Sequence, residues 1–278
     1  MLLGQHGWLS ARVERGRVWD CRLYTRMVPM LVDELQSGAV GVAASEAVVR
    51  LRGVSKVYGS FAALKNVSVE FAPGSSTMIL GENGAGKSTM LRMIAGLIAP
   101  SYGTVEVLGA AAGEDERQRS RIAYMSHAPM LYDEMSAMEN LKYFGSLDCT
   151  GACSCVGSPE MALRAVGLYP KLKRPVGQYS QGMRQRTALA RALQSDPELL
   201  LLDEPFSNLD VASAEHMVEL LADFRTWPVT GGGKRTILLT THQAHLGKPI
   251  ADETLTMRDG RIVGRVAREK DAGQGVTE

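Results

Sequence analysis

Cysteine, long apolar runs and net charge are all scarce in this chain of 278 residues. Its four cysteines are too few and too unevenly spaced for a disulfide framework, which predicts a protein of a reduced compartment, the cytoplasm. No apolar run approaches the roughly 18 residues that a membrane-spanning helix needs. The formal net charge of +1 provides no overall field that would attract nucleic acid or anionic lipid. The length allows one large domain or two small ones, with an ample core.

The first 47 residues differ from the rest in their pattern of apolar and polar residues. They show no sustained periodicity, and their basic residues are not followed by the continuous apolar segment of a secretory signal. Two interpretations are favoured over a functional module. One is an N-terminal extension without stable structure. The other is upstream sequence included by a misassigned start, because Met27 and Met30 could both initiate translation. The pattern from residue 48 to 268 predicts an ordered domain, followed by a tail at 269–278.

One glycine-rich stretch stands between a strand pattern and a helical pattern. Met78–Leu80 is predicted to be a short buried strand, and Thr89–Leu97 shows the apolar spacing of a helix. The stretch comprises Gly81, Glu82, Asn83, Gly84, Ala85, Gly86, Lys87, Ser88 and Thr89. Strand, glycine loop and helix are the context of a phosphate-binding loop, in which backbone N–H groups and a helix N-terminus hold phosphate. Lys87 is predicted to reach the β- and γ-phosphates, and the Ser88 hydroxyl to ligate Mg²⁺.

Two further strand patterns end in ionisable side chains. Leu199–Leu202 precedes Asp203 and Glu204. A second apolar run, Thr236–Leu239, leads to His242. Ligands bind at the carboxyl ends of strands in an open α/β sheet, so these side chains are expected near the phosphate loop. Asp203 would hold Mg²⁺, Glu204 would polarise the water that attacks the γ-phosphorus, and His242 would hold Glu204 and that water in line. Taken alone, Asp203 and Glu204 also fit ion-paired surface acids, and His242 also fits a histidine whose hydrogen bonds are satisfied.

The remaining pattern predicts a mixture of strands and helices. Further strands are expected at 48–51, 67–71, 103–109, 122–125, 254–257 and 261–263, and helices at 138–147, 160–166, 179–193 and 213–224. The polar run 114–121 is expected to be a solvated segment. Cys149, Cys153 and Cys155 lack the second cysteine pair of a structural zinc site, so an inert surface loop is favoured over metal binding. Tyr58 is either a base-stacking aromatic or an ordinary half-buried tyrosine.

The order of the motifs resembles that of the ATP-binding subunit of an ABC transporter. After the phosphate loop come Tyr179–Met183, the leucine strand with Asp203-Glu204-Pro205, Ser207–Asp210 and Thr240–His242. The resemblance covers roughly Val48 to Val266. It implies an α/β P-loop NTPase fold, with a RecA-like, mostly parallel sheet core, an antiparallel β subdomain and a helical signature subdomain at about 126–195.

The same resemblance implies ATP and Mg²⁺ as ligands, with Tyr58 stacking on adenine. The family's usual signature, Leu-Ser-Gly-Gly-Gln, reads Tyr-Ser-Gln-Gly-Met here, and its nucleotide-contacting residues would be Ser180, Gln181 and Gly182. Because this motif lies far from the chain's own phosphate loop in the family, two subunits pair head to tail, with Asp210 at the interface between them. The implied partners are a second ATP-binding subunit, giving a homodimer, and an integral membrane permease at the inner face of the cell membrane. No nucleic acid partner is implied.

His127 departs from the family pattern. The family usually places Gln after the strand at 122–125, where it contacts Mg²⁺ and the attacking water. A neutral imidazole accepts one hydrogen bond, whereas an imidazolium would repel Mg²⁺. His127 therefore reflects either neutral drift or membership of a subfamily. Together with Met135–Leu141 and Thr240–Gln243, it makes the chain similar to the haem-exporter ATPase of cytochrome c maturation.

The leading hypothesis is therefore the ATP-hydrolysing subunit of an ABC exporter, with haem for cytochrome c biogenesis as its cargo. Exporters of drugs, lipids or ions are alternatives, although they usually keep Gln at the position of His127. A soluble ABC ATPase of translation or DNA repair is a second class, which typically has two ATP sites or a long coiled-coil insertion. A nucleotide-binding scaffold without turnover is a third class, against which Lys87, Asp203, Glu204 and His242 argue.

Overall fold

The computed structural model describes residues 47–148, 158–227, 229 and 234–268. The chain divides into two units, Met1–Ala44 and Ser45–Glu278, and every described residue belongs to the second. The predicted tail, the cysteines of the predicted inert loop and all but the last residue of the predicted extension lie outside the described residues. The predicted domain boundaries therefore stay predictions.

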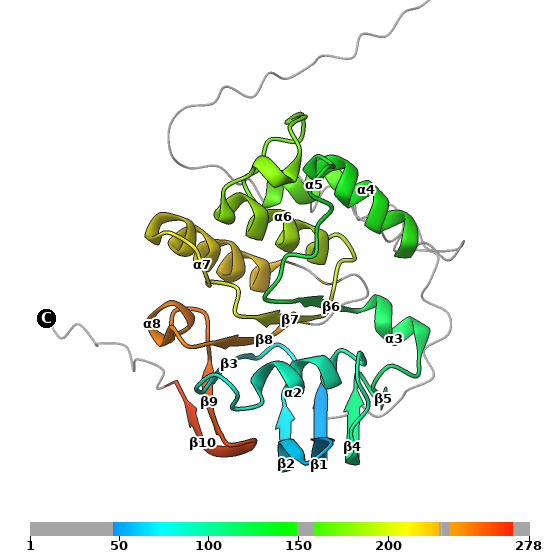
Figure 1. Cartoon of the computed structure of the whole chain (residues 1–278), viewed down its shortest axis with the longest axis vertical. Helices are drawn as coiled ribbons and strands as arrows, with labels where there is room; N and C mark the ends of the chain where they lie inside the picture. The colour runs from blue at the N-terminus through cyan, green and yellow to red at the C-terminus, as the bar shows by residue number, and fades with distance from the viewer. Residues whose placement is uncertain (1–46, 149–157, 228, 230–233, 269–278) are drawn as a thin grey trace, which may run out of the picture. The chain divides into compact units, whose positions relative to one another are not determined.

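A six-stranded, mostly parallel sheet runs through the described domain in the order β10-β9-β3-β8-β7-β6 (Figure 1). Its strands are β3 Ser76–Leu80, β6 Ile122–Met125, β7 Leu199–Asp203, β8 Thr236–Thr241, β9 Glu253–Arg258 and β10 Arg261–Ala267. Strands β3, β6, β7, β8 and β9 run parallel to one another, and β10 is antiparallel to β9. Every residue of β7 and β8 is buried, as expected for strands that are covered on both faces. The carboxyl ends of β3, β6, β7 and β8 consequently meet at one edge.

A second sheet is four-stranded and antiparallel, in the order β2-β1-β4-β5. Its strands are β1 Val49–Tyr58, β2 Phe61–Phe71, β4 Tyr102–Val107 and β5 Ala110–Ala111. The first two extend well beyond the apolar runs at 48–51 and 67–71 that predicted them. Their outer parts show no regular alternation of buried and exposed residues and contain register shifts, yet the backbone pairing continues where the apolar pattern ends.

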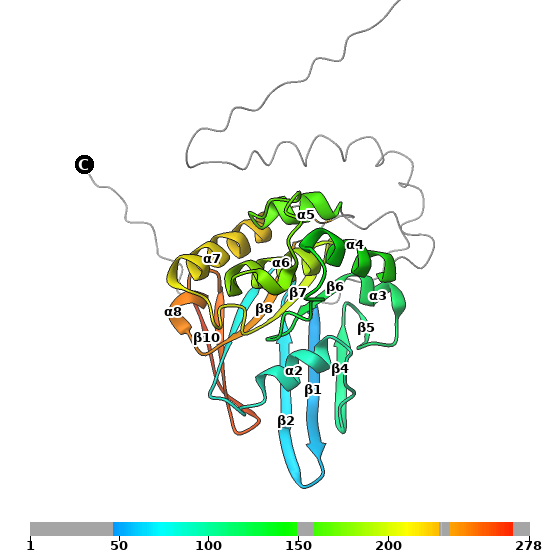
Figure 2. The same cartoon turned by 45° about the horizontal axis from the view of Figure 1, so that its top comes forward.

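The helices lie on both sides of the six-stranded sheet. The longer ones are α2 Lys87–Ile94, α4 Ala137–Asp148, α5 Pro159–Ala165, α6 Gln181–Leu193 and α7 Val211–Thr226. The shorter ones are α3 Glu116–Ser120, the 3₁₀ turn η1 Val176–Gln178 and α8 Ala244–Gly247. Helices α4 to α7 cover one face of the sheet, and α2 lies on the other side with the antiparallel sheet (Figures 1 and 2).

Strand β7 separates two hydrophobic cores. Leu200 and Leu202 pack into the core that the sheet shares with α4, α5, α6 and α7. Leu199 and Leu201 pack into the core formed with α2 and the antiparallel sheet. Because strand side chains alternate with a period of two, the next odd position, Asp203, belongs to the α2 side of the sheet. This alternation brings Asp203 to the N-terminal end of α2.

Differences from the predicted elements also occur at the start of α2 and within the segment 114–121. Helix α2 begins at Lys87, two residues before the predicted start, because the glycine loop leads directly into the first turn. Within the predicted solvated segment 114–121, a short helix α3 forms, capped by Asp115 and anchored by the buried Gln118. The Gln118 amide nitrogen donates to the carbonyls of Val107 and Ala110, a role that polar composition alone does not reveal. In the described part of the chain, no helix has both the length and the apolar composition to cross a bilayer.

Candidate nucleotide site

The glycine loop between β3 and α2 is held in a shape that side chains would disrupt. Gly84 and Gly86 have φ angles of 83° and 99°, in the left-handed region that favours glycine. A Cβ on Gly86 would lie 2.6 Å from the carbonyl oxygen of Ala63, and one on Gly81 would lie 2.5 Å from that of Met257. The loop thus depends on glycine where neighbouring backbone passes close by. It leads into α2, whose first N–H groups have no partner within the helix.

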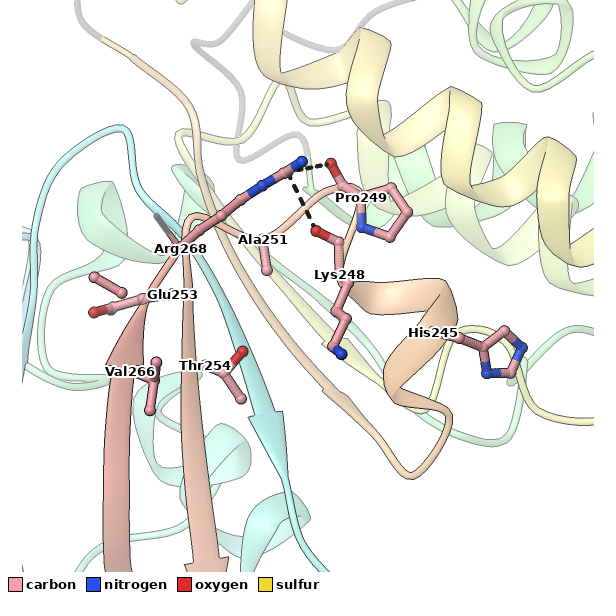
Figure 3. Close-up of a pocket in the computed structure, with 9 residues that line it drawn as sticks. His245, Lys248, Pro249, Ala251, Glu253, Thr254, Val266 and Arg268 are labelled. Atoms are coloured by element: carbon pink, nitrogen blue, oxygen red, sulfur yellow. Dashed lines mark hydrogen bonds between the residues drawn. The ribbon is translucent and has the colours of Figure 1, made fainter. Parts of the chain in front are cut away.

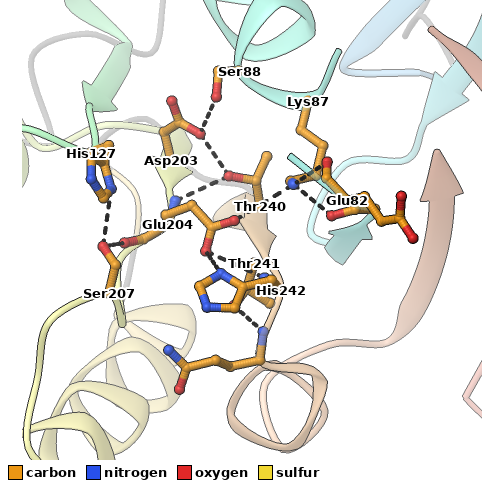
Figure 4. A network of polar contacts seen from close by, with 12 residues as sticks. Glu82, Lys87, Ser88, His127, Asp203, Glu204, Ser207, Thr240, Thr241 and His242 are labelled. Atoms are coloured by element: carbon orange, nitrogen blue, oxygen red, sulfur yellow. Dashed lines mark hydrogen bonds and ion pairs between the residues drawn. The ribbon is translucent and has the colours of Figure 1, made fainter. Parts of the chain in front are cut away.

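Lys87 is the first residue of α2, and its ammonium is folded back over the loop (Figure 4). Nζ donates to the carbonyl oxygens of Gly81, at 2.7 Å, and Glu82, at 3.2 Å. It also lies 3.6 Å from Oε1 of Glu204. The side chain is only 6% exposed, so the loop holds a desolvated positive charge whose only carboxylate partner among the described residues is Glu204.

Asp203 ends β7 and accepts three side-chain hydrogen bonds. Oδ1 accepts from the hydroxyls of Ser88 and Thr240, both at 2.8 Å. Oδ2 accepts from the Tyr124 hydroxyl at 3.2 Å. The carboxylate is 1% exposed, so these donors offset the cost of burying it. Ser88 and Asp203, both predicted as Mg²⁺ ligands, are therefore adjacent.

Tyr124 connects Asp203 with Arg92 of α2. Burial raises the pKa of the Tyr124 phenol, while the hydrogen bond with Arg92 opposes that rise. The same hydrogen bond is the main cause of the raised pKa of the Arg92 guanidinium. The phenol therefore stays protonated and can donate to Asp203. Arg92 and Asp203 thus share Tyr124 as a hydrogen-bond partner, and the charge of Asp203 also contributes to the raised pKa of Arg92.

Glu204 follows directly and has an unusual backbone conformation. Its φ is 52°, a left-handed value that costs energy in a residue with a side chain. The strain is offset because its N–H donates to both the carbonyl oxygen, at 3.1 Å, and the hydroxyl oxygen, at 3.0 Å, of Thr240. Oε2 lies 2.9 Å from Nδ1 of His242 and accepts from the His242 N–H at 3.3 Å. An ionised carboxylate only accepts hydrogen bonds, so Nδ1 of His242 carries the proton.

His127 lies beside this pair, on the loop after β6. The parallel pairing of β6 with β7 ends at Met125 and Leu202, two residues before His127 and Glu204. Nδ1 of His127 is 3.0 Å from the hydroxyl oxygen of Ser207. That hydroxyl donates to the carbonyl oxygen of Glu204 at 2.8 Å, as Figure 4 shows.

Tyr58 ends β1 and is half exposed. The ammonium of Lys56 lies 5.2 Å from the centre of its ring and donates to the carbonyl oxygen of Ala99 at 2.7 Å. Ser101 adds two bonds to the same strand end: its hydroxyl accepts from Val57 N–H at 3.0 Å, and its own N–H donates to the Ser55 carbonyl oxygen at 2.8 Å. The ring is therefore tied to the segment that follows the phosphate-loop helix. An ordinary half-buried tyrosine and a base-stacking one both remain compatible with this position.

The signature residues lie at a separate place. Ser180 caps α6 and accepts from the N–H of Met183 at 3.3 Å. Gly182 is buried, and a Cβ there would lie 2.5 Å from the hydroxyl of Ser213. Asp210 caps α7 and accepts from the Ser213 N–H at 2.7 Å, which holds the pKa of its carboxyl below the usual range. The structure thus brings the signature next to Asp210, whereas α6 and α2 lie on opposite sides of the six-stranded sheet (Figure 1).

The donor set fits a triphosphate with a hard divalent cation. The loop combines backbone N–H groups, a helix N-terminus and a desolvated ammonium, which together suit phosphate. No group of three or more His, Cys, Asp or Glu side chains is arranged for a metal within the described ranges. The Ser88 hydroxyl and the Asp203 carboxylate are oxygen donors of the kind that Mg²⁺ takes from protein when phosphates supply further ligands.

The sequence predicted no role for three hydroxyl groups of the site, those of Tyr124, Ser207 and Thr240, although two of them lie in the motifs Ser207–Asp210 and Thr240–His242. Their contacts hold Asp203, His127 and the backbone of Glu204 in place. Neutral hydroxyls are common on any surface, so composition does not single them out. The one signal was position, because Tyr124 and Thr240 stand at the carboxyl ends of strands next to the predicted acids.

A pocket of about 480 Å³ lies elsewhere, beside α8, β9 and β10 (Figure 3). Lys248, Pro249 and His245 line it, and Arg268 donates to the carbonyl oxygens of Lys248 and Pro249 at 3.3 and 3.2 Å. None of the predicted site residues lines this pocket. It is therefore separate from the chemistry described above.

Comparison with known proteins identifies the family of the chain. The family model described as "ABC transporter" matches residues 64–207, and one described as "AAA domain, putative AbiEii toxin, Type IV TA system" matches 171–246. The ABC transporter ATP-binding protein NatA of Bacillus subtilis is 35% identical over 74% of this chain and 82% of its own length. A fluoroquinolones export ATP-binding protein of Mycobacterium tuberculosis is 34% identical over 78% of this chain and 69% of its own. The sulfate/thiosulfate import ATP-binding protein CysA of Nocardia farcinica is 35% identical over 77% and 63%.

A solved structure shows the same fold. A dimeric ATP-binding cassette in a post-hydrolysis state, bound to ADP and Pi, matches with a TM-score of 0.69 and 27% identity. The match covers 79% of this chain and 98% of that one. The fold and the site define a P-loop NTPase, as predicted, and its activity is ATP hydrolysis. The chain belongs to the ABC transporter family, as an ATP-binding subunit.

Proposed function

We propose that this chain is the ATP-hydrolysing subunit of an exporter and works with a separate membrane permease. The observation that carries the enzymatic part is the contact between Glu204, His242 and Lys87 next to the Ser88–Asp203 pair. These residues unite a phosphate-binding cation, a candidate general base and a metal-binding carboxylate at one sheet edge. A scaffold without turnover has no need of the oriented carboxylate.

The residues divide the work as follows. Lys87 and the loop N–H groups bind the β- and γ-phosphates, and Tyr58 stacks on the adenine ring. Ser88 and Asp203 hold Mg²⁺, which neutralises phosphate charge when bound. Glu204 accepts a proton from the attacking water, while His242 fixes the orientation of its carboxylate. When the triphosphate arrives, its oxygens replace Glu204 as the partner of Lys87.

The second part of the site comes from another copy of the chain. Ser180, Gln181 and Gly182 lie at the N-terminal end of α6, across the sheet from the phosphate loop, so they serve a nucleotide bound to a partner subunit. Asp210 lies next to them and belongs to the same subunit interface. Pairing of this kind is two-fold and isologous, so closure creates two equivalent sites. The dimeric form of the related cassette bound to ADP and Pi supports this arrangement.

The direction of transport and the identity of the cargo are more specific proposals. Export is supported by the fluoroquinolones export relative, although a relative of similar identity is named for sulfate/thiosulfate import. Haem export for cytochrome c maturation rests on His127 and on the segments Met135–Leu141 and Thr240–Gln243, and none of the named relatives carries that assignment. A drug-like cargo is the second candidate and rests on the fluoroquinolones export relative.

The test is affinity purification of the tagged full chain from detergent-solubilised host membranes, with ATP turnover measured on the eluate. A co-purified multi-span protein that stimulates turnover supports the transport assignment. Reconstitution of that complex in vesicles then compares ATP-dependent movement of haem and of a fluoroquinolone. Recovery of ribosomal or DNA-repair proteins in place of a membrane protein would overturn transport. Inward movement of cargo would overturn export alone.

A further inference from the structure

Ser207 and His127 share a hydrogen bond whose direction can be worked out from the number of protons. Ser207 lies four residues after Asp203 and is 6% exposed. Its hydroxyl oxygen lies 2.8 Å from the carbonyl oxygen of Glu204 and 3.0 Å from Nδ1 of His127. A serine hydroxyl has a single proton and two lone pairs.

The carbonyl of Glu204 can only accept, so the single Ser207 proton is donated to it. The contact with His127 must then run in the other direction, with Nδ1–H donating to the Ser207 oxygen. A neutral imidazole carries one proton, so Nε2 of His127 is left with a free lone pair. His127 is exposed, and none of the described residues makes a hydrogen bond with Nε2.

We propose that Ser207 is a positioning residue that fixes His127 in the Nδ1–H tautomer, so that Nε2 presents an acceptor at the nucleotide site. This inference rests on the proposed function, because it gives that acceptor a role in ATP turnover. An unprotonated Nε2 offers one lone pair toward a water or a cation, where an amide carbonyl oxygen offers two. The opposite tautomer would present a donor at the same place.

The contact also links two loops. His127 follows β6, which leads on to the helical part of the domain, whereas Ser207 lies between Glu204 and the α7 cap Asp210. Because the Ser207 hydroxyl bonds the carbonyl of Glu204, the tautomer of His127 depends on the backbone of the candidate general base. A change of the His127 side chain to one without tautomers therefore removes the need for the serine.

The primary experiment is ¹⁵N NMR of the imidazole nitrogens of the full chain without nucleotide, at a pH where His127 is neutral. We expect a protonated Nδ1 and an unprotonated Nε2 for His127. Ser207→Ala should move the proton to Nε2 in most molecules, and Ser207→Thr, which retains the hydroxyl, should keep it on Nδ1. Ser195→Ala is the matched control, because the Ser195 hydroxyl also donates to a carbonyl three residues earlier but does not touch a histidine.

Measurements of ATP turnover test whether the tautomer of His127 matters for activity. Ser207→Ala should lower ATP turnover about tenfold, the lower end of what loss of such a supporting contact typically costs. In a His127→Gln background the same substitution should change turnover less than about twofold, because an amide needs no tautomer. Ser207→Thr should restore most of the activity.

Two results would overturn the inference: a proton on Nε2 of His127 in the parent, or an equal loss from Ser207→Ala in both backgrounds. If either occurs while Glu204→Gln still abolishes hydrolysis, the proposed function stands and only the tautomer role fails. If the parent does not hydrolyse ATP, the proposed function fails, and the NMR result still decides the tautomer.

Discussion

Lys87 and Glu204 face each other inside the candidate site, with Nζ 3.6 Å from Oε1. The two side chains are 6% and 14% exposed, so each offsets the cost of burying the other's charge. A triphosphate carries more negative charge to the same ammonium than one carboxylate does. Binding of the triphosphate should therefore replace Glu204 with phosphate as the partner of Lys87, which frees Glu204 to contact water.

Glu204→Gln should separate binding from hydrolysis. The amide keeps the size of the side chain but cannot accept a proton from water, so we expect turnover to fall by about 10²–10⁴-fold. Binding should persist or tighten, because a negative charge near the phosphates is removed. Hydrolysis is measured by phosphate release, and dimer formation by light scattering with Mg²⁺ and ATP. A parental rate in this variant would show that another group is the base.

His242→Ala should remove the group that orients Glu204. Nδ1 of His242 is 2.9 Å from Oε2, and its loss leaves the carboxylate free to rotate. We expect turnover to drop by about 10²-fold with little change in the Kd for ATP. His245→Ala, an exposed histidine on α8, is the control and should behave like the parent. Equal effects of the two substitutions would contradict the role of His242.

Lys56→Met should weaken recognition of the base and leave recognition of the phosphates unchanged. The ammonium lies 5.2 Å from the Tyr58 ring centre, where a cation–π contact is worth about 0.5–1 kcal/mol, or roughly twofold to fivefold in Kd. Calorimetry with ATP and with inorganic tripolyphosphate separates the two contributions. Lys56→Arg should retain the affinity, and the exposed Lys171→Met is the control. A matching loss for tripolyphosphate would rule out an action through Tyr58.

Arg235→Met should destabilise the fold without altering the site. The buried guanidinium pairs with Asp196, donates to the Pro197 carbonyl oxygen at 2.6 Å and lies 4.7 Å from the Phe224 ring centre. Loss of one partner from a buried ion pair costs about 3–5 kcal/mol, which corresponds to a Tm lower by roughly 6–20 °C in a domain of this size. Thermal unfolding measures the change. The exposed Arg52→Met should shift Tm little, and a stable Arg235→Met would show that the pair is dispensable.

The sequence predicts the buried strands of the fold better than the exposed ones. Leu199–Leu202 is fully apolar because β7 is covered on both faces, and the predicted strand is present. The outer half of β1, by contrast, has an irregular residue pattern and contains register shifts. Its pairing is set by the backbone of β2 and β4. Gln118 shows the same limit, since only the folded chain brings the carbonyl of Val107 to its side chain.

For the site, ionisable residues are predictable and the groups that support them are not. Asp203 and His242 stand out because charge or imidazole after an apolar strand is unusual. Thr240 precedes His242 by two positions, yet nothing in its type signals that it bonds both Asp203 and the backbone of Glu204. The left-handed conformation of Glu204 is likewise invisible in the sequence, because a glutamate rarely adopts it. The roles of the individual site residues stay predictions until the variants are measured.

The alternation of leucines along β7 has an evolutionary consequence. Even-numbered leucines pack only among the helices α4 to α7, and odd-numbered ones only on the side of α2. We expect a substitution in one core to be compensated within that core, with little effect on the packing at the opposite face of the sheet. Apolar residues beneath the helices can therefore change while the phosphate loop and its surroundings keep their packing. One five-residue strand in this way lies between two cores, each of which can be repacked with little effect on the other.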